Sequence, residues 1–158
     1  MTNTVYTEVY DLFSQLISDY RLTGLYLDDV TNSTTNFDTL VNSWFTLAIP
    51  DFEDICTQNL EDRNDTTGEF NYTLTTENKT ILAQIMVKYW LQREVNDILQ
   101  MRTKIQDRDF HTFSEQQNLT AKSNLLTKTK EEISQRLVDY GYKNADWTTW
   151  YTNNFIPS

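Results

Sequence analysis

Apolar residues recur at three- and four-residue steps along much of this chain, a pattern that predicts a mainly helical protein. The longest such stretch begins near Thr76 and continues to about Asp107 without a glycine or a proline. It predicts a helix of about 30 residues, roughly 45 Å long, whose wide apolar face belongs in the core. Ser114 and Gln117 have the spacing of a capping box, so a second long helix should start there. Gly141 is expected to end that helix as a C-cap.

The N-terminal half predicts two shorter helices. One is expected over residues 5–20, where large apolar side chains fall on a single helical stripe. The other is expected over residues 37–48. Pro50 should interrupt it, after which Asp51–Leu60 can carry on as another turn or two, because proline is tolerated in the first turn of a helix. Between the two, Gly24 and the polar run Asp28–Asn36 favour a loop.

A short β-hairpin or an extended loop is expected before the first long helix. Phe70, Tyr72 and Leu74 alternate with polar residues, which suits a strand that pairs with Thr57–Leu60. The fold class is therefore mainly α: a helical bundle with two long helices, a short β-hairpin or extended loop, and an extended C-terminal tail. We expect one core, made of Phe13, Leu16, Ile17, Val41, Phe45, Ile81, Leu82, Ile85, Met86, Tyr89, Val95, Ile98 and Leu99.

Composition and charge narrow the classes of partner. The 158 residues include 4 Trp, 9 Tyr and 8 Phe, too many aromatic residues for a disordered acidic chain, and the length suits one domain. The net charge of −10 argues against a protein that grips nucleic acid or an anionic membrane surface. Residues 1–80 contain 14 acidic and 3 basic residues, whereas residues 81–158 contain 9 and 10. The asymmetry indicates either a solvated acidic face or a surface that meets a basic partner or the basic helices of a neighbouring copy.

Little in the sequence points to catalysis or metal binding. Cys56 and His111 are the single cysteine and histidine, which excludes an internal disulfide and a zinc site of the Cys/His type. Acidic pairs one helical turn apart arise by chance in a chain with 23 acidic residues, as we expect for Glu94 with Asp97 and Asp51 with Asp54. We therefore expect no enzymatic activity, and no catalytic, cofactor-binding or metal-binding residues.

The sequence carries no evident targeting signal. Its N-terminus lacks a basic start followed by an apolar run, and no stretch approaches 18 apolar residues. We therefore expect no signal peptide and no membrane-spanning segment. The expected place is a cytoplasm, or a larger structure assembled there.

The C-terminal tail is the strongest candidate for partner binding. We expect a helical domain over residues 1–141 and a separate docking tail over residues 142–158. Four large aromatic residues fall within nine positions of this tail, between short polar runs, and cannot all be buried locally. Either they fold back over the bundle or they dock into another chain. The residues predicted to dock a partner are Trp147, Trp150, Tyr151 and Phe155.

Three stretches give the chain a resemblance to a known family. They are Tyr10–Leu16 near the start, the long helical stretch Thr80–Ile105, and the break at Phe113–Glu115 before the last helix. In a mainly helical chain of this size with an anchoring tail, they resemble the head–tail connector (adaptor) proteins of tailed double-stranded DNA bacteriophages. The resemblance is one of architecture and covers residues 5–141.

The resemblance implies a structural protein of the virion with no catalytic residues and no cofactor. It implies a homo-oligomeric ring, commonly of twelve copies, at the head–tail interface beneath the portal, after assembly in the host cytoplasm. The partners would be the portal protein and tail or neck proteins, and DNA would pass through without specific binding. The acidic balance departs from a DNA-gripping surface, although a negatively charged conduit repels the duplex and is compatible with its passage.

Two rival classes of function follow from the same sequence. An acidic inhibitor would mimic nucleic acid with its N-terminal half, and would be a monomer or dimer with carboxylates exposed in rows. An enzyme would need a nucleophile and a base in a recognisable pair, and the sequence offers none. The mass of the protein in solution separates the ring former from the inhibitor.

Overall fold

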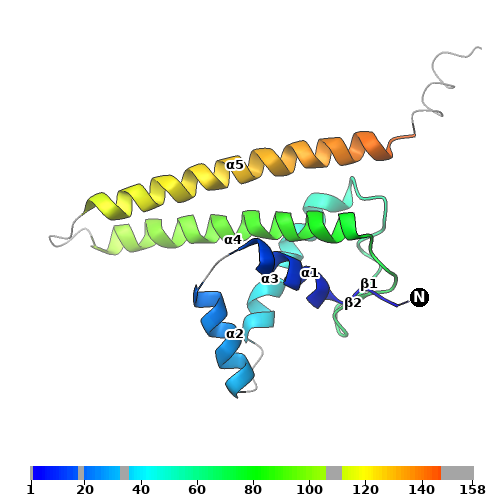
Figure 1. Ribbon diagram of the computed structural model, residues 1–158, viewed down its shortest axis with the longest axis horizontal. Coiled ribbons are helices and arrows are strands. Elements are labelled where there is room, and N and C mark those ends of the chain that lie inside the picture. Colours follow the sequence, from blue (N-terminus) through cyan, green and yellow to red (C-terminus); the bar gives the residue numbers. More distant parts are fainter. Residues whose placement is uncertain (1, 18–19, 33–35, 106–111, 147–158) are drawn as a thin grey trace, which may run out of the picture.

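The computed structural model describes residues 2–17, 20–32, 36–105 and 112–146, and these ranges form five helices and one small hairpin. The mainly helical fold class is confirmed. Figure 1 labels the elements along the chain. In order they are α1 (Tyr6–Leu16), α2 (Tyr20–Asn32), α3 (Asn36–Glu53), β1 (Arg63–Asn64), β2 (Glu69–Phe70), α4 (Thr76–Ile105) and α5 (Thr112–Asn144).

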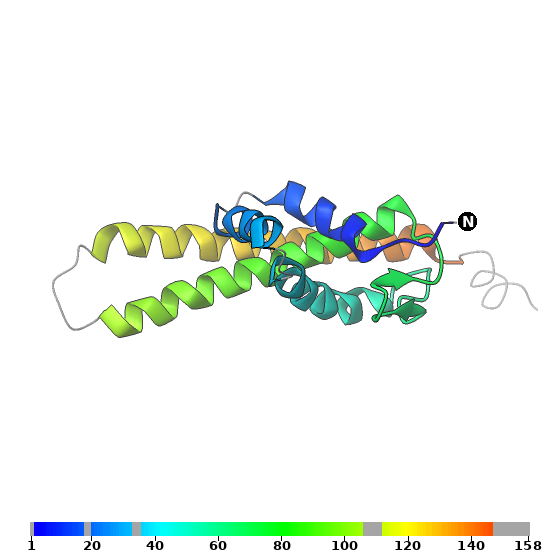
Figure 2. The ribbon, with the colours of Figure 1, turned by 90° about the horizontal axis from the view of Figure 1, so that it is seen from below.

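Helix α4 is the centre of the molecule. Helix α5 runs along one of its long sides, and α1 and α3 pack against another (Figure 1). Helix α2 packs on α3 and projects away from the long helices. The second half of α4 and the first half of α5 continue beyond α1 and α3 as a two-helix arm, which Figure 2 shows from below. We refer to the part formed by α1, α3, the hairpin and the adjoining halves of α4 and α5 as the base.

The start of α4 follows from its sequence. Thr75 caps the helix, since its Oγ1 accepts a hydrogen bond from the backbone N–H of Asn78 at 3.2 Å. Ile81, Leu82 and Ile85 then recur on the face toward α1 and α3 and are fully buried or nearly so. The predicted long helix is thus confirmed, from Thr76 to Ile105.

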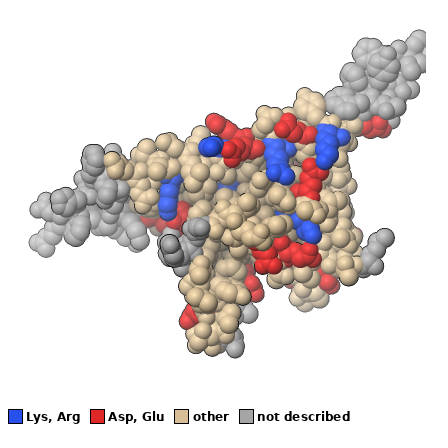
Figure 3. Space-filling model, in the orientation of Figure 1, with Lys and Arg blue, Asp and Glu red and all other residues tan. Residues whose placement is uncertain are grey.

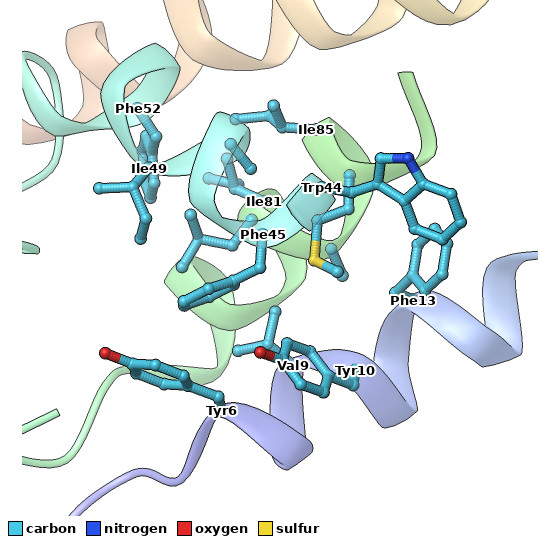
Figure 4. Close-up of a cluster of buried hydrophobic side chains, with 14 of the residues drawn as sticks. Tyr6, Val9, Tyr10, Phe13, Trp44, Phe45, Ile49, Phe52, Ile81 and Ile85 are labelled. Carbon is cyan, nitrogen blue, oxygen red and sulfur yellow. The ribbon is translucent and has the colours of Figure 1, made fainter. Parts of the chain in front are cut away.

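Aromatic rings form much of the core (Figure 4). The ring of Phe45 lies 4.6 Å from that of Tyr6 and 5.7 Å from that of Tyr10, and Phe13 meets Trp44 at 5.5 Å. Each such pair contributes about 0.5–1.5 kcal/mol beyond the burial of its surface. Most of the predicted core is confirmed as buried, namely Phe13, Val41, Phe45, Ile81, Leu82, Ile85, Met86 and Val95.

Two predicted core residues are wrong. Leu16 is 50% exposed because it is the last residue of α1 and borders an open hollow between α1, α4 and α5. Leu99 is 44% exposed because it lies in the arm, where α1 and α3 no longer cover α4. The same extension leaves Ile98 half-buried.

The predicted hairpin is present, but with a different partner strand. Arg63 pairs with Phe70 and Asn64 with Glu69, whereas Thr57–Leu60 forms no strand. The turn between β1 and β2 requires Gly68, whose φ of +68° suits a residue without a Cβ. The N-terminal segment extends the sheet through a bridge between Val5 and Glu69. This ties the first residues of the chain to the base.

The predicted loop around Gly24 is wrong. Residues 20–32 form α2, which includes Gly24 and the polar residues as far as Asn32. Burial of Leu22 against the core favours the helix despite the low propensity of glycine, asparagine and threonine. The Thr31 hydroxyl also donates to the carbonyl of Leu27 at 2.8 Å, which satisfies a polar group within the helix.

Other predicted helix boundaries are also wrong. The first helix ends at Leu16 rather than near residue 20. Pro50 lies inside α3, which continues to Glu53 because Ile49 and Phe52 on either side are buried. The last helix starts at Thr112, so Ser114 is not its N-cap.

Gly141 does not end α5, which continues to Asn144. The preceding residue, Tyr140, is held in the base, so the helix stays packed through the glycine. A Cβ at residue 141 would lie 3.5 Å from Cγ2 of Ile55, so the helix passes close to the base there. The predicted tail therefore loses its first three residues to α5.

Candidate docking surface

The four aromatic residues predicted to dock a partner lie outside the described residues, which end at Asp146. The same is true of His111. The structure does place the point from which the tail departs. The residues outside the described range are Trp147, Trp150, Tyr151 and Phe155.

The end of α5 is fixed on the base. The ring of Tyr140 meets that of Phe52 at 5.1 Å, and its hydroxyl accepts a hydrogen bond from the backbone N–H of Thr57 at 3.1 Å. Three residues later, Lys143 pairs with Glu77 at 2.7 Å. The tail therefore starts from a defined position beside the first turn of α4.

Helix α2 presents an apolar face to solvent. Its inner face packs on α3 through Leu22, which is 8% exposed. Next to this contact, Tyr26, Leu27 and Val30 have helical spacing and are 52%, 58% and 63% exposed, and the ring of Tyr26 also meets Phe37 of α3. We refer to these three residues as the outer face of α2. Clustered exposed apolar side chains of this kind mark interaction sites more often than isolated ones do.

A buried carboxylate holds α2 at a fixed angle to α3. Asp29 is 7% exposed and accepts hydrogen bonds from the backbone N–H of Phe37 and, at 3.2 Å, from the side-chain amide of Asn36. A negative charge at the start of α3 also interacts favourably with the helix dipole. The rings of Tyr26 and Phe37 meet at 5.4 Å. The outer face of α2 thus belongs to a helix that is fixed to the start of α3.

A groove of about 250 Å³ lies beside this contact of α2 with α3, between α1, α2 and the start of α3. Its volume is just below the roughly 300–1,000 Å³ of typical small-molecule pockets. It combines apolar walls with a few polar side chains, so a protein side chain with a polar end would suit it. Residues that line the groove include Asp11, Ser14, Ile17, Leu22, Tyr26 and Phe37.

Two other hollows have different surroundings. One, of about 290 Å³, lies between the end of α1 and the facing sides of α4 and α5, at Leu16, Val87 and Ile133. The other, of about 420 Å³, lies at the last turns of α5 and is lined mainly by charged side chains that include Glu77, Asp139 and Lys143.

The half-buried Cys56 has the environment of a structural thiol. Burial raises the pKa of Cys56, and the hydrogen bonds that involve Gln58 and Tyr140 only partly offset this effect. A raised pKa keeps the thiol protonated at neutral pH, whereas a nucleophilic cysteine needs its thiolate.

One member of each acidic pair noticed in the sequence joins two helices. Asp51 of α3 pairs with Lys88 and accepts a hydrogen bond from the Tyr89 hydroxyl at 3.0 Å, both on α4. Glu94 of α4 is 6% exposed and pairs with Lys122 of α5 at 2.7 Å. Among the described residues, no three His, Cys, Asp or Glu side chains are grouped so as to hold a metal ion.

Ion pairs between helices involve some of the carboxylates of the acidic N-terminal half. Glu8 pairs with Lys79 at 2.8 Å, and the pairs of Asp51 with Lys88 and of Glu77 with Lys143 follow the same scheme. In each, a carboxylate from the acidic half meets a lysine of a different helix, and Figure 3 shows acidic and basic patches side by side. Part of the acidic half is therefore neutralised within its own chain.

The sequence contained a signal for the outer face of α2 but not for the contact of Asp29 with the start of α3. Tyr26, Leu27 and Val30 have helical spacing, yet the polar run around them predicted a loop. Asp29 caps α3 from seven residues before its first residue, a relation that no local motif marks.

None of the described helices is long and apolar enough to cross a membrane. Comparisons with models of known protein families, with curated proteins and with solved structures gave no match. Any functional conclusion must therefore come from the chain itself.

Proposed function

We propose that this protein is a non-catalytic assembly protein, and specifically a head–tail connector of a tailed bacteriophage that works as an oligomeric ring. The observation that carries the proposal is the outer face of α2, an apolar surface that is exposed to solvent on a helix held against α3 by Asp29. An assembly protein needs such a surface, because association with another chain is driven mainly by apolar burial.

The architecture supports the specific form of the proposal. Two of the stretches that resemble connector proteins correspond to α1 and α4, whereas residues 113–115, expected as a break, belong to the first turn of α5. The antiparallel helices α4 and α5 pack along each other and form the two-helix arm that extends past the base (Figure 1). A net charge of −10 would line a conduit with negative potential and would let DNA pass without being held.

The acidic inhibitor receives less support. A mimic of nucleic acid needs carboxylates that are free to meet a basic partner, whereas Glu8, Asp51 and Glu77 of the acidic half are each paired with a lysine. No specific observation favours that function over the ring.

The test is the mass and shape of the full chain in solution, alone and coexpressed with the products of neighbouring open reading frames. Twelve chains of 18.7 kDa would weigh about 224 kDa, and electron microscopy should show rings. A protein that remains a monomer or a dimer under all these conditions contradicts the proposal and favours the inhibitor.

A truncation after Asn144 adds a second arm to the same experiment. Because α5 is already fixed through Tyr140, the shortened chain should keep its helical content and melting temperature but fail to assemble. If it melts much lower or aggregates, the tail belongs to its own core and is not a docking element.

A further inference from the structure

We propose that the groove between α1, α2 and α3, together with the outer face of α2, binds residues 147–158 of a second copy of this chain. This inference rests on the proposed ring and assigns its subunit contact. It commits to one occupant, the aromatic C-terminal segment, on grounds of chemistry, chain length and position.

The chemistry of the groove matches that of the segment. Ile17, Leu22 and Phe37 contribute apolar walls, while Asp11 and Ser14 contribute oxygen atoms. A tryptophan needs both, because its ring is apolar and its indole N–H seeks an acceptor once buried. The segment from residue 147 to 158 supplies two tryptophans and has no Asp, Glu, Lys or Arg, so it approaches an acidic surface without charge repulsion.

The end of α5 and the groove are separate places on one chain, on different sides of α4. The tail departs from the end of α5, on one side of α4, whereas α2 projects on the opposite side (Figure 1). The segment has twelve residues, which span at most about 40 Å when extended. It is long enough to lay several aromatic side chains along a neighbour.

This arrangement also has the symmetry that a ring requires. The groove and the segment are different surfaces at different places on the chain, so their contact is heterologous. Each copy would offer its segment to one neighbour and its groove to the other. Heterologous contacts of this kind close into a ring when the rotation between neighbours allows.

The test uses crosslinking between chains that each carry one cysteine. In a Cys56→Ser background, Ser14→Cys places a thiol at the groove and, in a second preparation, Thr149→Cys places one in the segment. When the two preparations are mixed with a short bismaleimide, we expect a covalent dimer. The control replaces Ser14→Cys by Ser134→Cys, the same substitution at an exposed position of α5, and should give no dimer.

The same two cysteines on one chain distinguish binding between copies from binding within a copy. If this double variant crosslinks only internally and the mixture gives no dimer, the segment occupies its own groove and the proposal is overturned. Absence of both products overturns it as well.

A pair of charge substitutions provides an independent readout. Val30→Asp on the outer face of α2 should weaken assembly at least tenfold, measured by sedimentation over a concentration series. Val138→Asp is the matched control, since Val138 is 50% exposed on α5, and should leave assembly unchanged. Both sites are exposed, so both variants should keep the helical content of the wild type.

These outcomes separate the inference from the proposed function. Rings that form normally with Val30→Asp and give no crosslink overturn the groove assignment and leave the connector standing. A chain that never assembles overturns both.

Discussion

At the scale of single residues, Phe45 shows how the base is joined. Its ring meets those of Tyr6 and Tyr10 on α1, and that of Phe70 on β2 at 6.1 Å, so one side chain of α3 connects three elements. Ile85 of α4 lies in the same core and is fully buried. Single substitutions there should affect the whole base.

Replacing Ile85 with aspartate should remove most of the stability of the protein. A carboxylate at this site would be buried without a partner, and such changes cost about 4 kcal/mol or more. Chemical denaturation followed by circular dichroism measures the effect. If the variant does not fold, Ile85→Ala should still show a loss of about 2–5 kcal/mol.

Leu99→Asp is the matched control for that prediction. Leu99 lies on the same helix but is 44% exposed, so its free energy of unfolding should change by less than about 1 kcal/mol. Equal effects at Leu99 and Ile85 would show that α4 is not the centre of the fold.

At the scale of elements, the hydrophobic pattern predicted the helices whose apolar repeat is visible within their own sequence. The stretch from Thr76 to Ile105 has many apolar repeats, and no local feature competes with them. Helix α2 depends instead on contacts that are distant in sequence, because Leu22 is buried in the core and Asp29 caps α3. Propensity at Gly24 pointed the other way, and tertiary packing prevailed.

The candidate docking surface was beyond prediction for the same reason. Whether Tyr26 and Val30 face solvent depends on which side of α2 meets α3, and that side is set by Leu22 and Asp29 together. The groove needs three helices at fixed angles. A single sequence carries the side chains of such a site but not its shape.

Gly24→Ala should stabilise the protein by about 0.5–1 kcal/mol. Gly24 lies inside α2, and a Cβ added there meets no atom within 4 Å, so alanine lowers the entropy lost on folding without a clash. Thermal unfolding should show a higher melting temperature. If residues 20–32 were a loop, as the sequence alone predicts, the substitution would have no such effect.

At the scale of the whole molecule, acid should weaken the fold. The Lys79 ammonium hydrogen-bonds to Glu8 and lowers the pKa of that carboxyl, and a hydrogen bond from the Tyr6 hydroxyl lowers the pKa of Asp65. A depressed pKa means that the folded state binds the proton less readily than the unfolded chain does. The stabilisation is therefore present above about pH 4–5 and is lost as the pH falls through the folded-state pKa.

Glu8→Gln isolates one of these contributions. The wild type should be more stable than the variant at pH 7, and the difference in unfolding free energy should shrink as the pH falls through the lowered folded-state pKa of Glu8. The comparison with the variant is needed because a lower pH also relieves the repulsion within a chain of net charge −10, and this effect changes the stability of both proteins. Glu131→Gln, at an exposed position of α5, should show no comparable pH dependence.

The central position of α4 also governs how the protein can fold during its synthesis. Helices α1 and α3 pack against the first part of α4, in which Val95 is the last described buried apolar residue, 42 residues after the end of α3 (95 minus 53). At about 5–20 residues per second, the ribosome needs roughly 2–8 s to make that stretch. For this interval the apolar sides of the first helices, with Val9, Phe13 and Ile49, lack the helix that covers them. Transiently exposed apolar surface of this kind favours aggregation, so we expect the yield of folded protein to depend on how quickly α4 follows α3.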